Sequence, residues 1–394
     1  MGYLKIMKNK KLIIYLLSVG RSDFDRYFPL IKALQSDKEI KLKVIASSAH
    51  FSKKFGYTYL EFEKHSINYV KSKSKYIDDG REESVGKNIS SEINFITGLI
   101  KEKKPDFFIV LGDRYEMISA PIAAIGFNIP VIHLYGGAVT LGAIDDLVRH
   151  SITKLSHIHF TASKQYSKII ENMGEETWRI KTIGVYSKKF LINQKYLNLS
   201  ELNNMFNFDF NLPTILITFH PVTREGRSIN YQLNNLINAI DNTKIQCIWT
   251  YPNSDTNHNF IIERIKKFEK ESKFRVKIIK YAGIETYLGL LRVCKLIIGN
   301  SSSGIVESSF FNLPSVNIGS RQSGKIIPKN VISVGYKNSD IKAGIQKALS
   351  KNFINKCKNY KSPYDYGFDE KKLVKEIKSI KISNKLLIKK PTIS

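Results

Sequence analysis

The strongest constraint on the fold is an alternation of short apolar runs and helical patterns along the chain. In the first half the apolar runs are KLIIYLLSVG (11–20), LKVIASS (42–48), DFFIVLGD (106–113), IPVIHLYGG (129–137) and HIHFTAS (157–163). Segments with helical periodicity, such as FDRYFPLIKALQSD and IDDLVRHSITKLS, lie between them. Apolar strands joined by helices predict a parallel sheet that is covered on both faces. The first half is therefore expected to be a doubly wound α/β unit.

The second half repeats this alternation. Its apolar runs are TILITFHP (214–221), KIQCIWTYP (244–252), FRVKIIKYAG (274–283), KLIIGNSSSG (295–304) and PSVNIG (314–319). A chain of 394 residues is too long for one ordinary core, and the periodicity fades after Tyr186. We therefore expect two doubly wound domains facing a central cleft, one at 1–186 and one at 187–365. Ligands of such sheets bind at the carboxyl ends of the strands.

The remaining segment, 366–394, is expected to add a helix and a tail. YDYGFDEKKLVKEIKSIKI carries an amphipathic helical pattern. ISNKLLIKKPTIS, which follows it, is typical of a frayed chain end.

Composition narrows the classes of partner. The formal net charge is +27, but lysine is spread over the whole chain, without an arginine-rich arm or a basic block interleaved with aromatic residues. This pattern disfavours nucleic acid and suits an anionic small molecule. The three cysteines are widely spaced and form no CxxC, which indicates neither a disulfide framework nor a zinc site. No run approaches the ~18 apolar residues of a membrane span, so we expect a cytoplasmic protein without membrane association.

The first polar cluster at a predicted strand end is LGDRYE (111–116), which contains Asp113. A carboxylate at this position can reach the cleft. Asp is also a favoured N-cap residue, so Asp113 could simply cap the following helix.

The stretch LYGGAVTLGAIDDLVRH (134–150) follows the next predicted strand and places glycines beside acids. Gly136 and Gly137 have no Cβ, and they would let the main chain lie against a ligand. Gly142 could do the same or could form a turn.

Asp145 stands near the start of the helix that follows these glycines, and it is the better candidate for a cleft acid. Arg149 lies four residues later, so the two side chains could equally form a routine pair on one helix face. The same ordinary explanation fits Asp146 and His150.

The second half offers two further candidates. TFHPVTREGR (218–227) places His220 at a strand end, followed by a turn that contains Arg224. Imidazole changes charge near neutral pH, and arginine beside it suits a phosphate. The alternative is a histidine buried in the core.

GNSSSGIVESS (299–309) joins a strand to a helix through a loop of small residues. Free N–H groups at the helix start and the hydroxyls of Ser301, Ser302 and Ser303 would suit a diphosphate. Glu307, one turn inside the helix, could accept hydrogen bonds from two ribose hydroxyls. The loop has no GK[ST] and the chain has no GxGxxG, which disfavours ATP hydrolysis and nicotinamide binding.

Together these motifs resemble the UDP-N-acetylglucosamine 2-epimerase family, and specifically its hydrolysing branch. The similar segments occur in the family's order: LGDRYEM, HLYGGAVTLGAIDDLVRHSITKLSHIHF, MGEETWRIKTIG (173–184), NSSSGIVE and NIGSRQSGK (317–325). The resemblance spans roughly residues 12 to 370. It implies two Rossmann-like domains around a cleft, an arrangement also called GT-B-like.

The resemblance also implies a reaction. The family removes UDP from the anomeric carbon together with the proton at C2, and then adds water to the glycal-like intermediate with inversion at C2. The product is N-acetylmannosamine or a diacetamido analogue, used for sialic, legionaminic or related nonulosonic acids. No metal or redox cofactor is required, and family members are commonly dimers or tetramers, so a homodimer or homotetramer is expected.

Carried over to this sequence, the family's site implies a catalytic set of Asp113, Asp145 and His220. Asp113 and Asp145 match acidic positions near the sugar, and His220 matches a histidine near the diphosphate. The matching or expected substrate-binding residues are Arg21, Gly136, Gly137, Arg149, Arg224, Ser301, Ser302, Ser303 and Glu307.

Three departures from the family pattern predict an altered sugar substrate or a reduced activity. Ala138 stands where relatives usually have the glutamate of a G-G-E motif, and Asp25 stands where a glycine is common. VYSKK (185–189) replaces a proline-glycine-leucine-aspartate segment. Loss of a cleft carboxylate can cost roughly two to four orders of magnitude in proton transfer.

Two rival functions stay open on the sequence alone. A glycosyltransferase of the two-Rossmann type would also clamp a nucleotide sugar with a small-residue loop and a glutamate. A non-catalytic UDP-sugar-binding paralogue would account for Ala138.

Overall fold

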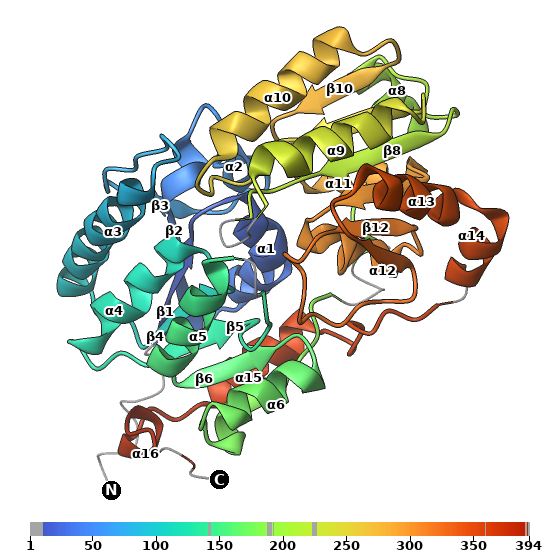
Figure 1. Ribbon diagram of the computed structural model, residues 1–394. Coiled ribbons are helices and arrows are strands. Elements are labelled where there is room, and N and C mark those ends of the chain that lie inside the picture. Colours follow the sequence, from blue (N-terminus) through green and yellow to red (C-terminus); the bar gives the residue numbers. More distant parts are fainter. Residues whose placement is uncertain are drawn as a thin grey trace, which may run out of the picture.

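The computed structural model describes residues 11–140, 143–186, 191, 193–222, 227–358, 360–390 and 392. They form two parallel β-sheets with helices packed around them (Figure 1). The first sheet has seven strands in the order β3-β2-β1-β4-β5-β6-β7, and the second has six in the order β10-β9-β8-β11-β12-β13. The predicted fold class, two doubly wound α/β units, is confirmed.

The first sheet contains β1 (Leu12–Ser18), β2 (Ile40–Ala46), β3 (Tyr69–Lys71), β4 (Phe107–Leu111), β5 (Val131–Leu134), β6 (Ile158–Thr161) and β7 (Ile180–Thr182). Its helices are α1 (Arg21–Ser36), α2 (Leu60–Lys64), α3 (Glu82–Glu102), α4 (Ser119–Ile125), α5 (Asp145–Leu155) and α6 (Lys164–Asn172). Short 3₁₀ turns are η1 (Ser48–Phe51), η2 (Tyr115–Ile118) and η3 (Thr177–Arg179).

The second sheet contains β8 (Thr214–Thr218), β9 (Gln246–Thr250), β10 (Val276–Ile279), β11 (Leu296–Gly299), β12 (Ser315–Ile318) and β13 (Val331–Val334). Its helices are α8 (Leu199–Phe206), α9 (Ile229–Asp241), α10 (His258–Glu271), α11 (Gly283–Val293), α12 (Glu307–Phe310), α13 (Asn338–Leu349) and α14 (Lys351–Cys357), with the turn η4 (Ser302–Gly304).

Side chains of β1 show why its apolar run is continuous. Ile14 and Leu16 pack in a cluster with Phe24 of α1, whereas Tyr15 and Leu17 pack in a second cluster with Ile96 of α3. Successive residues of a strand point to opposite faces, so both faces of this sheet are covered.

Strand register brings the polar strand ends of the second sheet together. Thr218 of β8 pairs with Gly299 of β11, so His220 and Ser301, each two residues further on, leave the sheet at the same edge. A Cβ at Gly299, where φ is +139°, would lie 1.9 Å from the carbonyl oxygen of Thr218. Only glycine allows this close approach.

The C-terminal segment returns to the first sheet. In Figure 1, α15 (Glu370–Ser379) lies among the green elements β6 and α6 of the first half. Leu373 and Ile377 of α15 are buried in the cluster that contains Leu16, and α15 packs against α1. The chain passes from one sheet to the other between Thr182 and Thr214, and we propose that the domain boundary lies near Tyr186 within this stretch.

The expectation of a frayed C-terminal end is wrong for residues 384–390. A further helix, α16 (Asn384–Leu387), forms there, and buried Arg179 donates to the carbonyl oxygens of Lys385 and Leu386 at 2.9 and 2.8 Å. Sequence periodicity could not reveal this attachment, because one internal arginine makes it to main-chain atoms. Within the described ranges, none of the helices has the length and apolarity needed to cross a membrane.

Candidate active site

A cavity of about 180 Å³ lies between the two halves of the chain and is lined by residues of both. Its polar lining from the first half includes Arg21, Asp23, Asp25, Arg26, Asp113, Arg114 and Asp145. Its polar lining from the second half includes His220, Asn253, Tyr281, Tyr287, Ser301, Ser302, Ser303, Glu307, Arg321 and Lys325. The structure thus brings the predicted acids and the predicted nucleotide loop to one cavity.

Asp113 follows β4 at the sheet edge and is held by Arg149 of α5. Arg149 is 1% exposed, and it donates to the carboxylate of Asp113 and to the carbonyl oxygen of Ala138, the latter at 2.6 Å. Burial alone would raise the pKa of Asp113, but the charges of Arg149 and Lys325 outweigh it and hold this pKa below its usual range. Asp113 is therefore an ionised carboxylate at neutral pH.

Asp145 is the first residue of α5 and has a different electrostatic environment. Burial raises the pKa of Asp145 to about 7, and the nearby carboxylates of Asp113 and Asp255 add to the effect. Two carboxylates in one cavity thus have pKa values pushed apart, which is the arrangement that general acid–base chemistry uses. The pairing of Asp145 with Arg149 that the sequence left open is absent among the described contacts, since Arg149 binds Asp113 and Asp146 instead.

Three of the predicted substrate contacts lie outside the observed cavity lining. Gly136, Gly137 and Arg149 are not among the residues that line the cavity. A Cβ on Gly136 would lie 2.7 Å from Nδ1 of His133, and one on Gly137 would lie 2.3 Å from the carbonyl oxygen of Tyr166. These glycines are required by packing inside the first half, and Arg149 acts on the cavity through Asp113.

His220 lies at the end of β8, is 4% exposed and lines the cavity. Its Nδ1 accepts from the backbone N–H of Asn253 at 3.0 Å, and its backbone N–H donates to the side chain of Asn300 at 2.7 Å. Burial, followed by the charges of Arg321 and Arg21, lowers the pKa of His220 well below its usual value. The ring is therefore neutral and carries its proton on Nε2, where it can donate to a ligand.

The serine loop and Glu307 line the same cavity as His220, and all of them belong to the second half of the chain. Ser301 accepts from the backbone N–H of Ser303 at 3.3 Å, and the hydroxyl of Ser303 lies 2.5 Å from that of Tyr287. Glu307 is the first residue of the four-residue helix α12, rather than one turn inside a longer helix as predicted.

Arg26 links this loop to the first half of the chain. Its guanidinium donates to the hydroxyl of Ser302 at 3.3 Å and lies 3.8 Å from Oε1 of Glu307. Oε2 of Glu307 is buried and has no hydrogen-bond partner within the described part of the chain. A donor from a ligand would satisfy it.

Arg21 lines the cavity, but its guanidinium is already engaged. It donates to the carbonyl oxygens of Lys280 and Tyr251 at 2.7 and 2.5 Å, and so it bridges the two halves. Arg224 and Gly142 lie outside the described residues.

Several lining residues were missed although the quoted motifs contain them. Arg114, in LGDRYE, makes a buried ion pair with Asp255 of the second half at 2.6 Å. Arg321 and Lys325, in NIGSRQSGK, reach the cavity from the loop after β12. Charged residues directly after a strand were the available signal, but sequence alone could not choose among them.

The three departures from the family pattern differ in whether they line the cavity. Asp25 lines the cavity and accepts from the hydroxyl of Tyr281 at 3.2 Å, and burial followed by Glu61 raises its pKa to about 7. Ala138 packs against the core beside the cavity. Of VYSKK, Val185 and Tyr186 are described, and Tyr186 lines the cavity.

Comparison with known proteins decides the family. The family model described as UDP-N-acetylglucosamine 2-epimerase matches residues 32–378. The chain belongs to the UDP-N-acetylglucosamine 2-epimerase family.

Two similar relatives in this epimerase family carry named activities. The GDP/UDP-N,N'-diacetylbacillosamine 2-epimerase (hydrolyzing) of Campylobacter jejuni is 34% identical over 348 residues, which covers 88% of this chain and 89% of the relative. The UDP-N,N'-diacetylbacillosamine 2-epimerase (hydrolyzing) of Legionella pneumophila is 32% identical, with 96% of this chain and 98% of the relative covered.

A solved epimerase structure supports the fold. The UDP-GlcNAc 2-epimerase from Neisseria meningitidis, bound to UDP-GlcNAc, superposes with a TM-score of 0.77 at 18% identity and covers 94% of this chain and 100% of that chain. The similarity to the family predicted from the sequence motifs is thus confirmed.

Proposed function

We propose that the protein is a hydrolysing 2-epimerase that converts a UDP-linked 2-acetamido sugar and water into UDP and an N-acetylmannosamine-type sugar. The observation that carries the proposal is the single cavity in which Asp113 and Asp145 meet His220, the serine loop and Glu307. The first half supplies acids for the sugar, and the second half supplies the histidine, the serine loop and the glutamate for a nucleotide.

The sugar is either UDP-N-acetylglucosamine or a UDP-diacetamido sugar. Both relatives described above are named for diacetylbacillosamine, which favours the diacetamido substrate. This assignment places the product in the biosynthesis of nonulosonic acids. The two relatives' names also favour an epimerase over a glycosyltransferase.

The nucleotide is proposed to lie along Ser301–Ser303 and Glu307. The unpartnered oxygen of Glu307 would accept from a ribose hydroxyl, and Nε2–H of His220 would donate to the diphosphate. A neutral donor fixed by its second nitrogen stabilises the departing diphosphate without needing to titrate. Arg21 and Arg26 add positive charge at the diphosphate end of the cavity. Arg224 is also proposed to contact the diphosphate.

The sugar is proposed to lie between Asp113 and Asp145. Ionised Asp113 stabilises the positive charge that develops at the anomeric carbon as the C1–O bond breaks. Asp145, with its raised pKa, takes a proton from C2 and holds it at neutral pH. Removal of the C2 proton and departure of UDP leave a double bond between C1 and C2.

The decisive experiment incubates the purified protein with UDP-N-acetylglucosamine and, separately, with the UDP-diacetamido-trideoxyhexose. UDP release with a manno-configured product that carries deuterium at C2 in heavy water is the expected result, read by proton NMR. UDP release only in the presence of an acceptor sugar would contradict the proposal in favour of a glycosyltransferase. Tight binding without deuterium uptake would indicate a non-catalytic paralogue.

We also propose a homodimer or homotetramer located in the cytoplasm. Light scattering of the eluted peak from size-exclusion chromatography tests the oligomeric state. A mass of 45.1 kDa would be that of one chain and would contradict it.

A further inference from the structure

Lys325 is the cation of the cavity lining to which no role has yet been given. The four lining arginines all make hydrogen bonds or ion pairs: Arg21 to main-chain carbonyls, Arg26 to Ser302, and Arg114 and Arg321 to Asp255. For Lys325, no side-chain hydrogen bond or ion pair occurs within the ranges that the structure describes. Its ammonium group is therefore available to a ligand.

Backbone packing places Lys325 at the sugar end of the cavity. Gly324 has a φ of +91°, and a Cβ there would lie 2.5 Å from Cγ1 of Val139. The loop after β12 thus touches the turn that leads from Ala138 into α5, the helix that begins with Asp145. Lys325 reaches the cavity from the second half of the chain, whereas Asp145 reaches it from the first.

The charged groups facing Lys325 come from four elements. Burial, together with the charges of Arg149, Arg26 and Arg321, lowers the pKa of Lys325 to about 7, while the charge of Asp113 opposes this shift. The residue itself is partly exposed along the cavity wall. An amine in these surroundings exchanges its proton near neutral pH.

Inversion at C2 sets a geometric requirement. A proton must leave C2 on one face of the sugar ring, and another must arrive on the opposite face. Two proton-transfer groups that approach the sugar from different sides meet this requirement, and Asp145 and Lys325 line the cavity from different halves of the chain.

We propose that Lys325 is a catalytic residue, the acid that delivers the new proton to C2 on the face opposite Asp145. The inference rests on the proposed function and deepens it. In the first step Asp145 takes the C2 proton, the C2–H electron pair forms the C1=C2 bond, and UDP leaves with the C1–O pair.

In the second step the ammonium of Lys325 gives its proton to C2 and becomes a neutral amine. The double-bond electrons form the new C2–H bond, and water adds to C1 as its second proton passes to solvent. Asp145 then loses its proton and Lys325 regains one from solvent. The balance is one sugar nucleotide and one water consumed, and one free sugar, one UDP and one proton released.

The test compares K325R and K325Q with wild type, and K329Q is the control because Lys329 is exposed nearby. Arginine keeps the positive charge but does not release its proton. Both Lys325 variants should lose about 100-fold or more in formation of the epimerised sugar while still releasing UDP. The glycal-type intermediate should accumulate, and its olefinic proton should appear in the NMR spectrum.

Three results would overturn the assignment. If K325R kept the wild-type kcat, Lys325 would contribute only its positive charge, which holds the diphosphate, and would not transfer a proton. Loss of UDP release in both variants, with UDP binding intact, would place Lys325 before C–O cleavage. If the variants do not fold, the wild-type pH profile decides: kcat should fall above pH 7 as the ammonium is lost, and a flat profile to pH 9 would contradict the role. A wild type inactive on both sugar nucleotides would refute the proposed function instead.

Discussion

Arg149 of α5 and Asp113 after β4 form an ion pair in which the guanidinium is 1% and the carboxylate side chain 32% exposed. The pair joins Arg149, which does not line the cavity, to an acid that does. It thereby keeps Asp113 ionised beside Asp145, whose pKa is raised to about 7. The difference between these two acids depends on a residue that no substrate has to touch.

Replacing Arg149 by Met should therefore change both stability and its dependence on pH. Breaking a buried pair costs about 3 to 5 kcal/mol, and we expect about 3 because Asp113 keeps some contact with water. In wild type the depressed pKa of Asp113 stabilises the fold above pH ~4, and this contribution is lost as the pH falls below ~4. In R149M the effect of burial dominates and raises the pKa of Asp113. The free energy of unfolding should therefore increase as the pH falls from neutral to ~4.

Urea unfolding between pH 3 and 7 measures this prediction. R81M is the matched control, because Arg81 is 73% exposed. Parallel pH curves for R149M and wild type would show that Arg149 does not set the ionisation of Asp113.

Replacing His220 by Ala should reduce turnover far more than it reduces stability. Loss of a positioned donor to the diphosphate is expected to lower kcat by about 100 to 1,000-fold. Stability should fall by about 1 to 3 kcal/mol, because the backbone N–H of Asn253 loses its acceptor. Steady-state kinetics and thermal unfolding on one preparation separate the two effects. A collapsed fold would identify His220 as a structural residue.

Replacing Glu307 by Gln should weaken UDP binding. A hydrogen bond to a charged group contributes about 1.5 to 3 kcal/mol, so the Kd should rise roughly 10 to 100-fold. Calorimetry with UDP and with its 2',3'-dideoxy analogue completes a double-mutant cycle between the protein and the ligand. Wild type should bind UDP more tightly than the analogue, whereas E307Q should bind the two with similar Kd values. The exposed E271Q variant is the control. Equal discrimination by wild type and E307Q would place the ribose elsewhere.

The fold was predictable to the extent that hydrophobic periodicity encodes it. All ten apolar runs overlap an observed strand, whereas the strands β3, β7 and β13 and the helix α3 were not predicted. The buried face of α3 begins with Ser84, Asn88 and Glu92. Asn88 donates to the carbonyl oxygen of Ile77 at 2.9 Å, and Glu92 accepts from Ser72 at 3.1 Å. A face buried through polar partners distant in sequence has no apolar stripe to detect.

The sequence predicted which strand-end residues reach the cavity, but it did not predict which side chains they contact there. Strand-end residues such as Asp113 and His220 reach the cavity as the parallel-sheet rule requires. The partner of Arg149 was not predictable, because its distance to Asp113 depends on how α5 packs against β5 and η2. The same reason applies to Lys325, which lines the cavity from a loop whose Gly324 packs closely against Val139.

Replacing Gly137 by Ala should reduce stability without changing the KM of the folded enzyme. Its φ is +78°, and the new Cβ would meet the backbone of α6. Strain and overpacking together should cost about 2 to 4 kcal/mol. G98A is the opposite control, because Gly98 lies inside α3 where an added Cβ would meet open space, and alanine should stabilise that helix by about 0.5 to 1 kcal/mol. Denaturant unfolding should show the two signs, and a raised KM in G137A would return this glycine to the substrate site.

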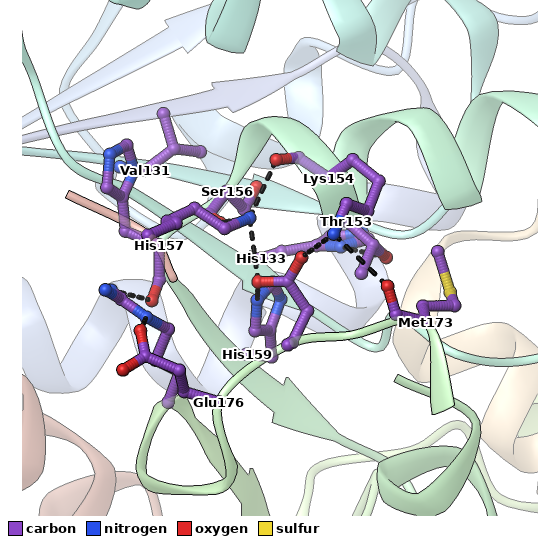
Figure 2. Close-up of polar contacts among 12 residues, drawn as sticks. Val131, His133, Thr153, Lys154, Ser156, His157, His159, Met173 and Glu176 are labelled. Atoms are coloured by element: carbon purple, nitrogen blue, oxygen red, sulfur yellow. Dashed lines mark hydrogen bonds and ion pairs between the residues drawn. The ribbon is translucent and has the colours of Figure 1, made fainter. Parts of the chain in front are cut away.

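Lys389 near the C-terminal end should stabilise the first half of the chain through a buried carboxylate. Glu175 is 1% exposed, and it accepts from Lys154 and lies 2.7 Å from Nζ of Lys389. Lys389 also donates to the carbonyl oxygens of Lys154 and Ser156, both at 2.7 Å (Figure 2). K389M should therefore lower the free energy of unfolding by about 2 kcal/mol.

The pKa of Glu175 determines how the stabilisation by Lys389 changes with pH. Burial alone would raise the pKa of Glu175, but hydrogen bonds from His159, Lys154 and Lys389 lower it to about 2. Its stabilising contribution is therefore present above pH ~4.3 and is lost as the pH falls toward 2. K389M should show a shallower loss of stability on acidification than wild type, whereas K390M, at an exposed neighbour, should follow wild type. Equal acid unfolding curves for K389M and K390M would mean that the tail adds nothing to the ionisation of Glu175.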